Sequence, residues 1–526
     1  MSEPPQPPRG GASEMSSQGP TPGADPEPSG EAPGPGGSSS VSRGYAVGER
    51  AILNTLYRSG SEIIGRFASL LLFVVAGRKL GQNGLGAFVV AVAYLGFVMV
   101  AVDLGLDRYI LRIMSRDRAA SERLFFNVLG LKLALALPLF AAGFVVLDLL
   151  GYPHQVQATA WALAPGVFSD SIARTQLSVF LSHERGGPPS LADGIQRVCS
   201  AALGIAALGA GLGVVSVAAS YSIGSMIGVA IGFFLLARTV GMPSFTLATR
   251  AWRRLAVSSV PFATQDTFTV ILARADALIL SLSAGQAAVG RYGAAYRLFE
   301  STLLITYALG GAFAAMFTYL GPDSEPPLRA VFQRSIKLAL VLLAPVAVAF
   351  GVFATPICRL IYGSHFASAG VPLRILAPAI VLIGVATLAN SLMLSRGHLR
   401  AVVSLAAGMA AVNVALNLIL IPLYSDAGAA AAMLITEVIY GAWILRISTR
   451  AVGGISWLTT AAGAVLAGAT MTAVTLALNG TMWLALTLGA AVYALVLFGV
   501  ERVVSPADAR FLAQLVRRRL LSRPTS

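Results

Sequence analysis

Charged residues are scarce in this 526-residue chain. They make up 12% of it, whereas soluble globular proteins carry roughly 25%. Hydrophobic residues make up 56%, and the mean hydropathy is +0.74. A helix needs about 20 apolar residues to cross a bilayer, so this content suffices for about fourteen crossings. The composition predicts an all-α polytopic membrane protein and leaves no room for a large soluble enzyme domain.

Cysteine and histidine are also rare. Cys199 and Cys358 lie within or beside apolar stretches, so they offer neither a disulfide framework nor a metal cluster. The few histidines are scattered, and no nucleophile lies at a catalytic spacing from a base. We therefore expect no cofactor, no metal and no enzymatic activity.

Apolar runs bounded by polar, glycine or proline residues predict fourteen transmembrane helices. Their approximate ranges are 59–78, 86–106, 126–149, 157–180, 190–211, 214–237, 256–282, 287–318, 333–356, 370–394, 400–422, 427–447, 457–478 and 481–500. We expect six-helix lobes at 43–237 and 256–447, a cytoplasmic linker at 238–255, two more helices within 448–501 and a basic tail at 502–526.

Basic residues are unevenly divided between the two predicted sides of the membrane. If the N-terminus is cytoplasmic, the outside loops carry only Arg78, Lys79 and Arg359, and most other basic loop residues lie inside. This is the asymmetry of the positive-inside rule, so both termini are expected in the cytoplasm. The net charge of +14 then indicates contact with anionic membrane lipids, through clusters such as 517–519, and requires no nucleic acid. Three lysines against 35 arginines favour a bacterial origin, and hence a bacterial cytoplasmic membrane.

The first 42 residues differ in composition from the rest. Proline, glycine and serine dominate residues 1–42, which contain no apolar run. Such a segment cannot bury enough apolar surface to offset the entropy lost on ordering, so we expect a disordered cytoplasmic tail. A docking tail for a partner is the alternative.

A short internal repeat follows the first and seventh predicted helices. The stretches 81–86 and 285–290 both read GQxxxG, and each leads into a long apolar helix. A repeat displaced by six helices keeps its orientation in the membrane, which predicts two lobes related by an axis along the membrane normal with a cavity between them.

Several motifs resemble those of a known transporter family. They are residues 76–81 with Gly86, 103–106 and Arg112; Asp276 with 289–297; 360–363 with Phe366, Leu373 and Leu376; and Asn413, Asn417, 420–422 and 428–431. In this order they resemble the polysaccharide transporter (oligosaccharide-lipid flippase, Wzx-like) family of the MOP superfamily, which also contains MATE drug exporters and lipid II flippases. One departure is Ser425, where the family usually has glycine.

The two asparagines in these motifs have two interpretations. Asn413 and Asn417 lie one turn apart on one face of a predicted helix. They either join neighbouring helices by hydrogen bonds or line a polar cavity.

Three arginines lie deep in predicted helices. Arg66 and Arg297 are about 12 and 15 Å from the starts of their helices, and Arg174 lies deep in the fourth. A buried charge in lipid is a candidate functional residue, and the planar guanidinium binds phosphate through two hydrogen bonds. The resemblance implies the same arrangement, because family members place arginines in a central cavity. The alternative is structural pairing, of Arg297 with Glu300 and of Arg174 with Asp170. Lys132, Arg197, Arg274, Arg291 and Arg374 lie nearer the predicted helix ends, where their side chains could extend to water.

Acidic residues at similar depth suggest ion coupling. Asp266 and Glu437 lie about 15 Å along their helices, and Asp170 is similarly deep. Each could bind a proton or Na⁺, or neutralise an arginine.

The resemblance implies a flippase that moves a polyprenyl-pyrophosphate-linked oligosaccharide across the cytoplasmic membrane by alternating access. Polysaccharide polymerase or export machinery would be a further partner. A lipid II flippase and a MATE-type multidrug exporter are the nearest alternatives. A membrane glycan ligase or polymerase and a non-transporting scaffold are alternatives of other classes.

Overall fold

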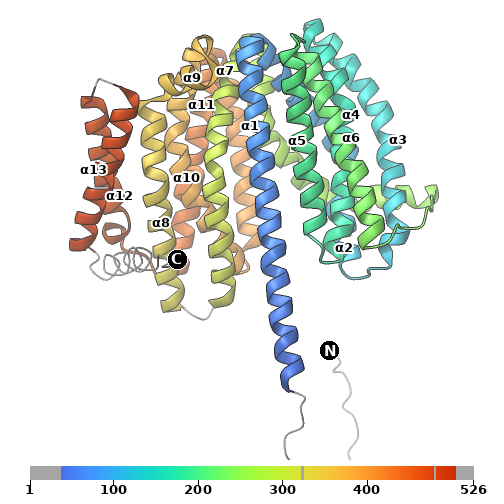
Figure 1. Ribbon diagram of the computed structural model, residues 1–526, viewed down its shortest axis with the longest axis horizontal. Helices are drawn as coiled ribbons and strands as arrows, with labels where there is room; N and C mark the ends of the chain where they lie inside the picture. Colours follow the sequence, from blue (N-terminus) through green and yellow to red (C-terminus); the bar gives the residue numbers. More distant parts are fainter. Residues whose placement is uncertain (1–36, 321–324, 479–480, 505–526) are drawn as a thin grey trace, which may run out of the picture. The chain divides into compact units, whose positions relative to one another are not determined.

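The computed structural model describes residues 37–320, 325–478 and 481–504, with side chains from Ile63 onward except at positions 265, 325 and 326. Every regular element in these ranges is a helix, which confirms the all-α prediction (Figure 1). The helices are α1 (Gly37–Asp103), α2 (Leu106–Met114), α3 (Ala120–Leu149), α4 (His154–Ser182), α5 (Gly187–Gly209), α6 (Val214–Thr239), α7 (Thr249–Leu320), α8 (Glu325–Val352), α9 (Ala354–Tyr362), η1 (Ser364–Ala369), α10 (Gly370–Ser395), α11 (Leu399–Ala451), α12 (Trp457–Ala477) and α13 (Met482–Val504).

Each of three long helices is interrupted by one residue with a positive φ. These are Gly81 in α1 (φ 67°, ψ −172°), Gly285 in α7 (φ 78°, ψ −178°) and Ser425 in α11 (φ 54°, ψ −131°). Within the described ranges, ten helices are long and apolar enough to span a bilayer, and they include these three. Each of the three breaks divides its helix into two membrane crossings. Helix α4, which is more polar than these ten helices, supplies one further crossing. The fourteen predicted crossings are therefore all present as helices.

The breaks lie on one face of the molecule. Gln82 donates to the backbone oxygen of His365 in η1. We call the face that carries Gly81, Gly285 and η1 the kink face. The turns at 115–119 and 183–186 lie at the opposite face, where Arg118 pairs with Glu184 at 2.7 Å. We call that face the loop face; in Figure 1 it lies at the bottom, where α2 is labelled, with α9 and the kink face at the top.

The two GQxxxG stretches pack against each other at the kink face. A Cβ atom added to Gly86 would collide with the carbonyl of Gln286, and one added to Gly290 would collide with the carbonyl of Gln82. Only glycine allows the two backbones to approach this closely. Because each stretch contacts the other through its equivalent residues, the repeat seen in the sequence is a two-fold relationship in space.

The helices pack in groups that follow the chain. Helices α4, α5 and α6 pack together, as do α7, α8, α10 and α11, and α12 and α13 pack on α8. The first part of α7 also contacts α2 and α3, and a Cβ atom on Gly105 would overlap the backbone at Phe262. Thus α7 contacts helices of both groups.

Several expected boundaries fall at different residues in the structure. Helix α1 begins at Gly37, inside the expected tail, and residues 1–36 of that tail lie outside the described ranges. Helix α7 begins at Thr249, inside the expected linker. Helix α13 ends at Val504, and the remainder of the basic tail lies outside the described ranges.

Candidate functional site

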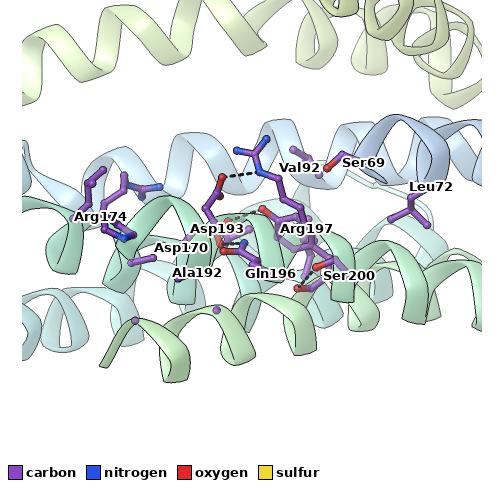
Figure 2. Close-up of a pocket in the computed structure, with 18 of the residues that line it drawn as sticks. Ser69, Leu72, Val92, Asp170, Arg174, Ala192, Asp193, Gln196, Arg197 and Ser200 are labelled. Atoms are coloured by element: carbon purple, nitrogen blue, oxygen red, sulfur yellow. Dashed lines mark hydrogen bonds and ion pairs between the residues drawn. The ribbon is translucent and has the colours of Figure 1, made fainter. Parts of the chain in front are cut away.

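A cavity of about 700 Å³ lies among α1, α4, α5, α6 and α7. It extends to Gly186 at the loop face. Its charged lining residues are Arg174, Arg197, Arg274, Arg297, Asp170 and Asp193. Figure 2 shows the part of its wall formed by α4 and α5. Four arginines facing one cavity make it a candidate site for an anionic ligand.

Arg297 was predicted from its depth and does line the cavity. Its Nη1 donates to Glu300 Oε2 at 2.9 Å, one turn along α7. Its guanidinium carbon lies 5.7 Å from the centre of the Phe73 ring on α1. The side chain is therefore held between a carboxylate and an aromatic face, and it is both paired and accessible to the cavity.

Arg174 also lines the cavity, but its partner is not the expected one. It pairs with Asp103 at 2.5 Å and lies 3.8 Å from Asp107, at the junction of α1 and α2. Asp170 accepts hydrogen bonds from Gln196 at 2.8 Å and Tyr221 at 2.5 Å. The alternative in which Arg174 forms an ion pair with Asp170 is not found, because tertiary contacts supply each residue with a nearer partner.

Arg66 lies outside the set of residues that line the cavity. It is in α1, one turn before Ser69, which does line it. Its guanidinium carbon lies 5.9 Å from the Tyr307 ring centre on α7. Its predicted role in the cavity stays a prediction.

Two lining arginines were assigned by sequence reasoning to the membrane interface. Arg197 pairs with Asp193 at 3.0 Å across one turn of α5, as seen in Figure 2. Arg274 of α7 has no hydrogen-bond or ion-pair partner within the ranges the structure describes. Depth along a helix does not reveal which face meets a cavity, so sequence position alone could not identify these two residues.

Lys132 belongs to a buried network beside the cavity. Its side chain is fully buried, and its ammonium lies 2.8 Å from Asp107 and 3.0 Å from Asp103. It also donates to the hydroxyls of Ser171 and Thr175, both at 3.0 Å. The expectation that Lys132 extends to water is wrong. The signal in the sequence was the pair of aspartates four positions apart.

The predicted ion-coupling acids lie apart from one another. Asp266 pairs with Arg108 at 2.8 Å, and it does not line the cavity. Glu437 is half-buried in α11 and forms no hydrogen bond or ion pair with any residue that the structure describes. Of these acids, only Asp170 faces the cavity, while Glu300 touches it through Arg297.

Asn413 and Asn417 join the two parts of α11. Asn417 donates to Asn413 at 2.9 Å, and Asn413 donates to Thr436 at 3.1 Å. Neither asparagine lines the cavity. Of the two interpretations offered by the sequence, the structure supports hydrogen bonding between helices.

Hydrogen bonds between residues of the N-terminal and C-terminal halves of the chain close the kink face. Arg78 Nε donates to the backbone oxygen of Ile361 at 2.6 Å, and Gln82 donates to that of His365. The hydroxyls of Tyr152 and Ser281 lie 2.6 Å apart. These contacts lie beyond the end of the cavity that is opposite Gly186.

Comparison with solved structures defines the class of protein. The lipid II flippase MurJ in an inward closed conformation matches with a TM-score of 0.72 and 14% identity, over 85% of this chain and 99% of that one. An inward-facing multidrug resistance MATE family transporter of the MOP superfamily matches with a TM-score of 0.59 and 15% identity, over 73% and 94%. At these identities the likeness concerns the fold. This chain is a multi-pass membrane protein with the fold of MOP superfamily transporters.

Sequence comparison identifies the family. The family described as "Polysaccharide biosynthesis protein" matches residues 52–315, half of the chain. The chain belongs to this family, which confirms the predicted resemblance. It is also 23% identical over 323 residues to a probable low-salt glycan biosynthesis flippase of Haloferax volcanii. That match covers 60% of this chain and 66% of the relative, so the chain spans just under two thirds of the relative's length.

Proposed function

We propose that the protein is a flippase that moves a polyprenyl-pyrophosphate-linked oligosaccharide across the cytoplasmic membrane for surface polysaccharide synthesis. The observation that supports this most directly is the set of four arginines around one cavity within the lipid-spanning region. A pyrophosphate leaving water needs donors and positive charge, because an unpaired anion is very unstable in a medium of low dielectric constant. Family membership and the flippase relative from H. volcanii support the same substrate class.

In this proposal the arginines bind the head group and the prenyl chain stays in lipid. Arg274 offers the phosphate a positive charge that no carboxylate compensates, since it has no acidic partner within the described ranges. Arg297 and Arg197 keep their carboxylates close, which limits the net attraction and allows release. Guanidinium groups suit this task because they remain charged and bind phosphate through two hydrogen bonds.

The position of the contacts supports alternating access. With the kink face closed, the cavity is reached from the loop face, which we assign to the cytoplasm because its turns carry Arg116, Arg118 and Arg185. Opening to the outside requires the contacts of Arg78 and Gln82 to break. We propose that residues 43–237 and 256–447 move as two lobes, with both termini cytoplasmic, and that the packed glycine stretches hold the lobes together while the kink face is closed.

The driving ion is a separate proposal. Glu437 is half-buried and forms no ion pair with a described residue, so it is our candidate for proton or Na⁺ coupling. Asp266 is paired with Arg108, and Glu300 with Arg297, so we assign both to charge pairing. A polysaccharide polymerase or export complex would receive the product.

The alternatives differ in what the cavity should contain. A MATE-type exporter of cationic drugs would need a predominantly acidic cavity, whereas this one has more arginines than carboxylates. A lipid II flippase would use the same pyrophosphate chemistry, and the family match favours the polysaccharide branch. The matched relatives are flippases and transporters, in agreement with the expectation that the chain makes and breaks no bond.

The test is surface polysaccharide export in a strain that lacks its own copy of the gene. We expect Arg274→Ala and Arg297→Ala to lose most export and to accumulate the lipid-linked precursor inside the cell. Arg297→Lys should retain part of the activity, because it keeps the charge but not the planar geometry. Arg359→Ala, in α9 outside the cavity, is the control at matched membrane expression. Full export by both cavity variants would refute the proposal and favour a scaffold.

A further inference from the structure

One wall of the cavity carries a polar cluster that pyrophosphate binding does not use. Asp170 comes from α4, Gln196 from α5 and Tyr221 from α6, and all three line the cavity. Gln196 and Tyr221 each donate to one oxygen of the Asp170 carboxyl. Gln196 also donates to the Ser225 hydroxyl at 2.9 Å. Figure 2 shows Asp170 and Gln196 beside each other on this wall.

The cluster presents hydrogen-bond acceptors to the cavity. The Asp170 carboxyl has about four lone pairs, and its hydrogen bonds with Gln196, Tyr221 and Ser225 leave at least one of them free. The Tyr221 oxygen can accept while it donates. Gln196 Oε1 accepts no hydrogen bond from a residue that the structure describes. Asp170 forms no ion pair with any described residue. A matching ligand therefore offers donors, as the hydroxyl groups of a sugar do.

The cluster lies next to the phosphate-binding arginines. Asp170 and Arg174 are one turn apart on α4, about 6 Å along the helix axis. A phosphate held at Arg174 would bring the group attached to it against the acceptors of Asp170, Gln196 and Tyr221. In the proposed substrate, that group is the first sugar.

We propose that Asp170, Gln196 and Tyr221 form a sugar-binding subsite that selects a neutral, hydroxyl-bearing sugar next to the pyrophosphate. This proposal rests on the proposed function. An acidic sugar is disfavoured there, because an ionised carboxylate is an acceptor only and would meet other acceptors. The subsite assigns Asp170 to substrate selection rather than to ion coupling.

The test measures binding to the purified full-length protein with four probes. These are a polyprenyl pyrophosphate, the corresponding polyprenyl alcohol, the pyrophosphate carrying one neutral hexose, and the pyrophosphate carrying one hexuronic acid. We expect the wild type to bind the hexose-bearing lipid about tenfold more tightly than the bare lipid, since one charge-assisted hydrogen bond contributes about that much. The hexuronic acid should give no such gain.

Two variants then test whether Asp170 and Tyr221 are responsible for the preference for the hexose-bearing lipid. Asp170→Asn and Tyr221→Phe should each bring the ratio of the two affinities, hexose-bearing to bare, close to one. The controls keep the ratio near ten: Asp148→Asn removes an exposed carboxylate of α3, and Tyr493→Phe removes a phenol of α13 that donates to Val341. Using Tyr221→Phe beside Asp170→Asn guards against a variant that fails to fold.

Three further outcomes separate this inference from the proposed function. If the wild type binds the pyrophosphate tightly but does not prefer the hexose, the subsite is wrong and the flippase proposal stands. If Asp170→Asn keeps the affinity ratio but abolishes transport, the carboxyl acts in coupling and the subsite is again wrong. If the wild type binds a polyprenyl pyrophosphate no better than the corresponding alcohol, both proposals are overturned.

Discussion

The Lys132 ammonium and the Asp107 carboxylate lie 2.8 Å apart, where α3 passes the junction of α1 and α2. Asp103, at 3.0 Å from the same ammonium, is also the partner of Arg174 on the cavity wall. One buried cluster therefore connects a cavity arginine to the break at Leu104 and Gly105, both of which have positive φ. A ligand that attracts Arg174 changes the charge balance of this cluster directly.

The first prediction concerns Lys132. Replacing it with methionine leaves two carboxylates without their main counter-charge, and removing one partner of a buried ion pair destabilises by about 3–5 kcal/mol. We expect Lys132→Met to unfold at a much lower temperature in detergent than the wild type. Lys79→Met, at an exposed position, is the control. Equal melting of the two variants would show that the network is not structurally important.

The second prediction concerns Ser425, the non-glycine residue at the break in α11. Its φ of 54° with ψ of −131° is a conformation that side chains other than glycine rarely adopt, at a cost of about 1–3 kcal/mol. We expect Ser425→Gly to raise the thermal midpoint. Ser404→Gly, in the regular part of the same helix, should lower it, because glycine weakens a helix interior by about 0.5–1 kcal/mol. Both variants replace serine with glycine. A rise in the thermal midpoint for Ser425→Gly together with a fall for Ser404→Gly would confirm the prediction.

The third prediction concerns the packed glycines. A methyl group on Gly86 or Gly290 would overlap the carbonyl of Gln286 or Gln82, so alanine at either site must separate the two stretches. We expect both variants to lose stability and transport. Gly408→Ala is the control, because no atom lies within 4 Å of the added methyl group. Alanine should be tolerated or stabilising there. Normal transport by Gly290→Ala would contradict a role for this packing in closing the kink face.

The fourth prediction concerns the closed kink face. With Cys199 and Cys358 replaced, a cysteine at Ser69 reports whether the cavity is open to an impermeant thiol reagent added outside the cell. Arg78→Ala removes a donor to the carbonyl of Ile361, and we expect labelling from outside to increase. Lys79→Ala, the neighbouring exposed cation, should leave labelling unchanged. If labelling by Arg78→Ala stays at the control level, Arg78 does not hold this face closed.

Much of the fold could be predicted from the amino-acid sequence. Long apolar runs must become helices in lipid, since every backbone group has to be hydrogen-bonded within the segment, and this predicts the fourteen crossings. The GQxxxG stretches marked the positions of two helix breaks because only glycine tolerates that backbone conformation. The deep position of Arg297 also pointed to a residue that lines the cavity.

The sequence alone determined that the chain is a helical membrane protein with arginines at depth and that it resembles a family of flippases. Tertiary structure decided which of those arginines share a cavity and which acids neutralise them. Arg274 and Arg197 were assigned to the interface, and Lys132 was expected to reach water, because depth along a helix was measured without knowledge of the helix's neighbours. Pairing is a property of distance in space, and residues such as Arg174 and Asp103, far apart in the chain, become partners only when packing brings α4 beside the junction of α1 and α2.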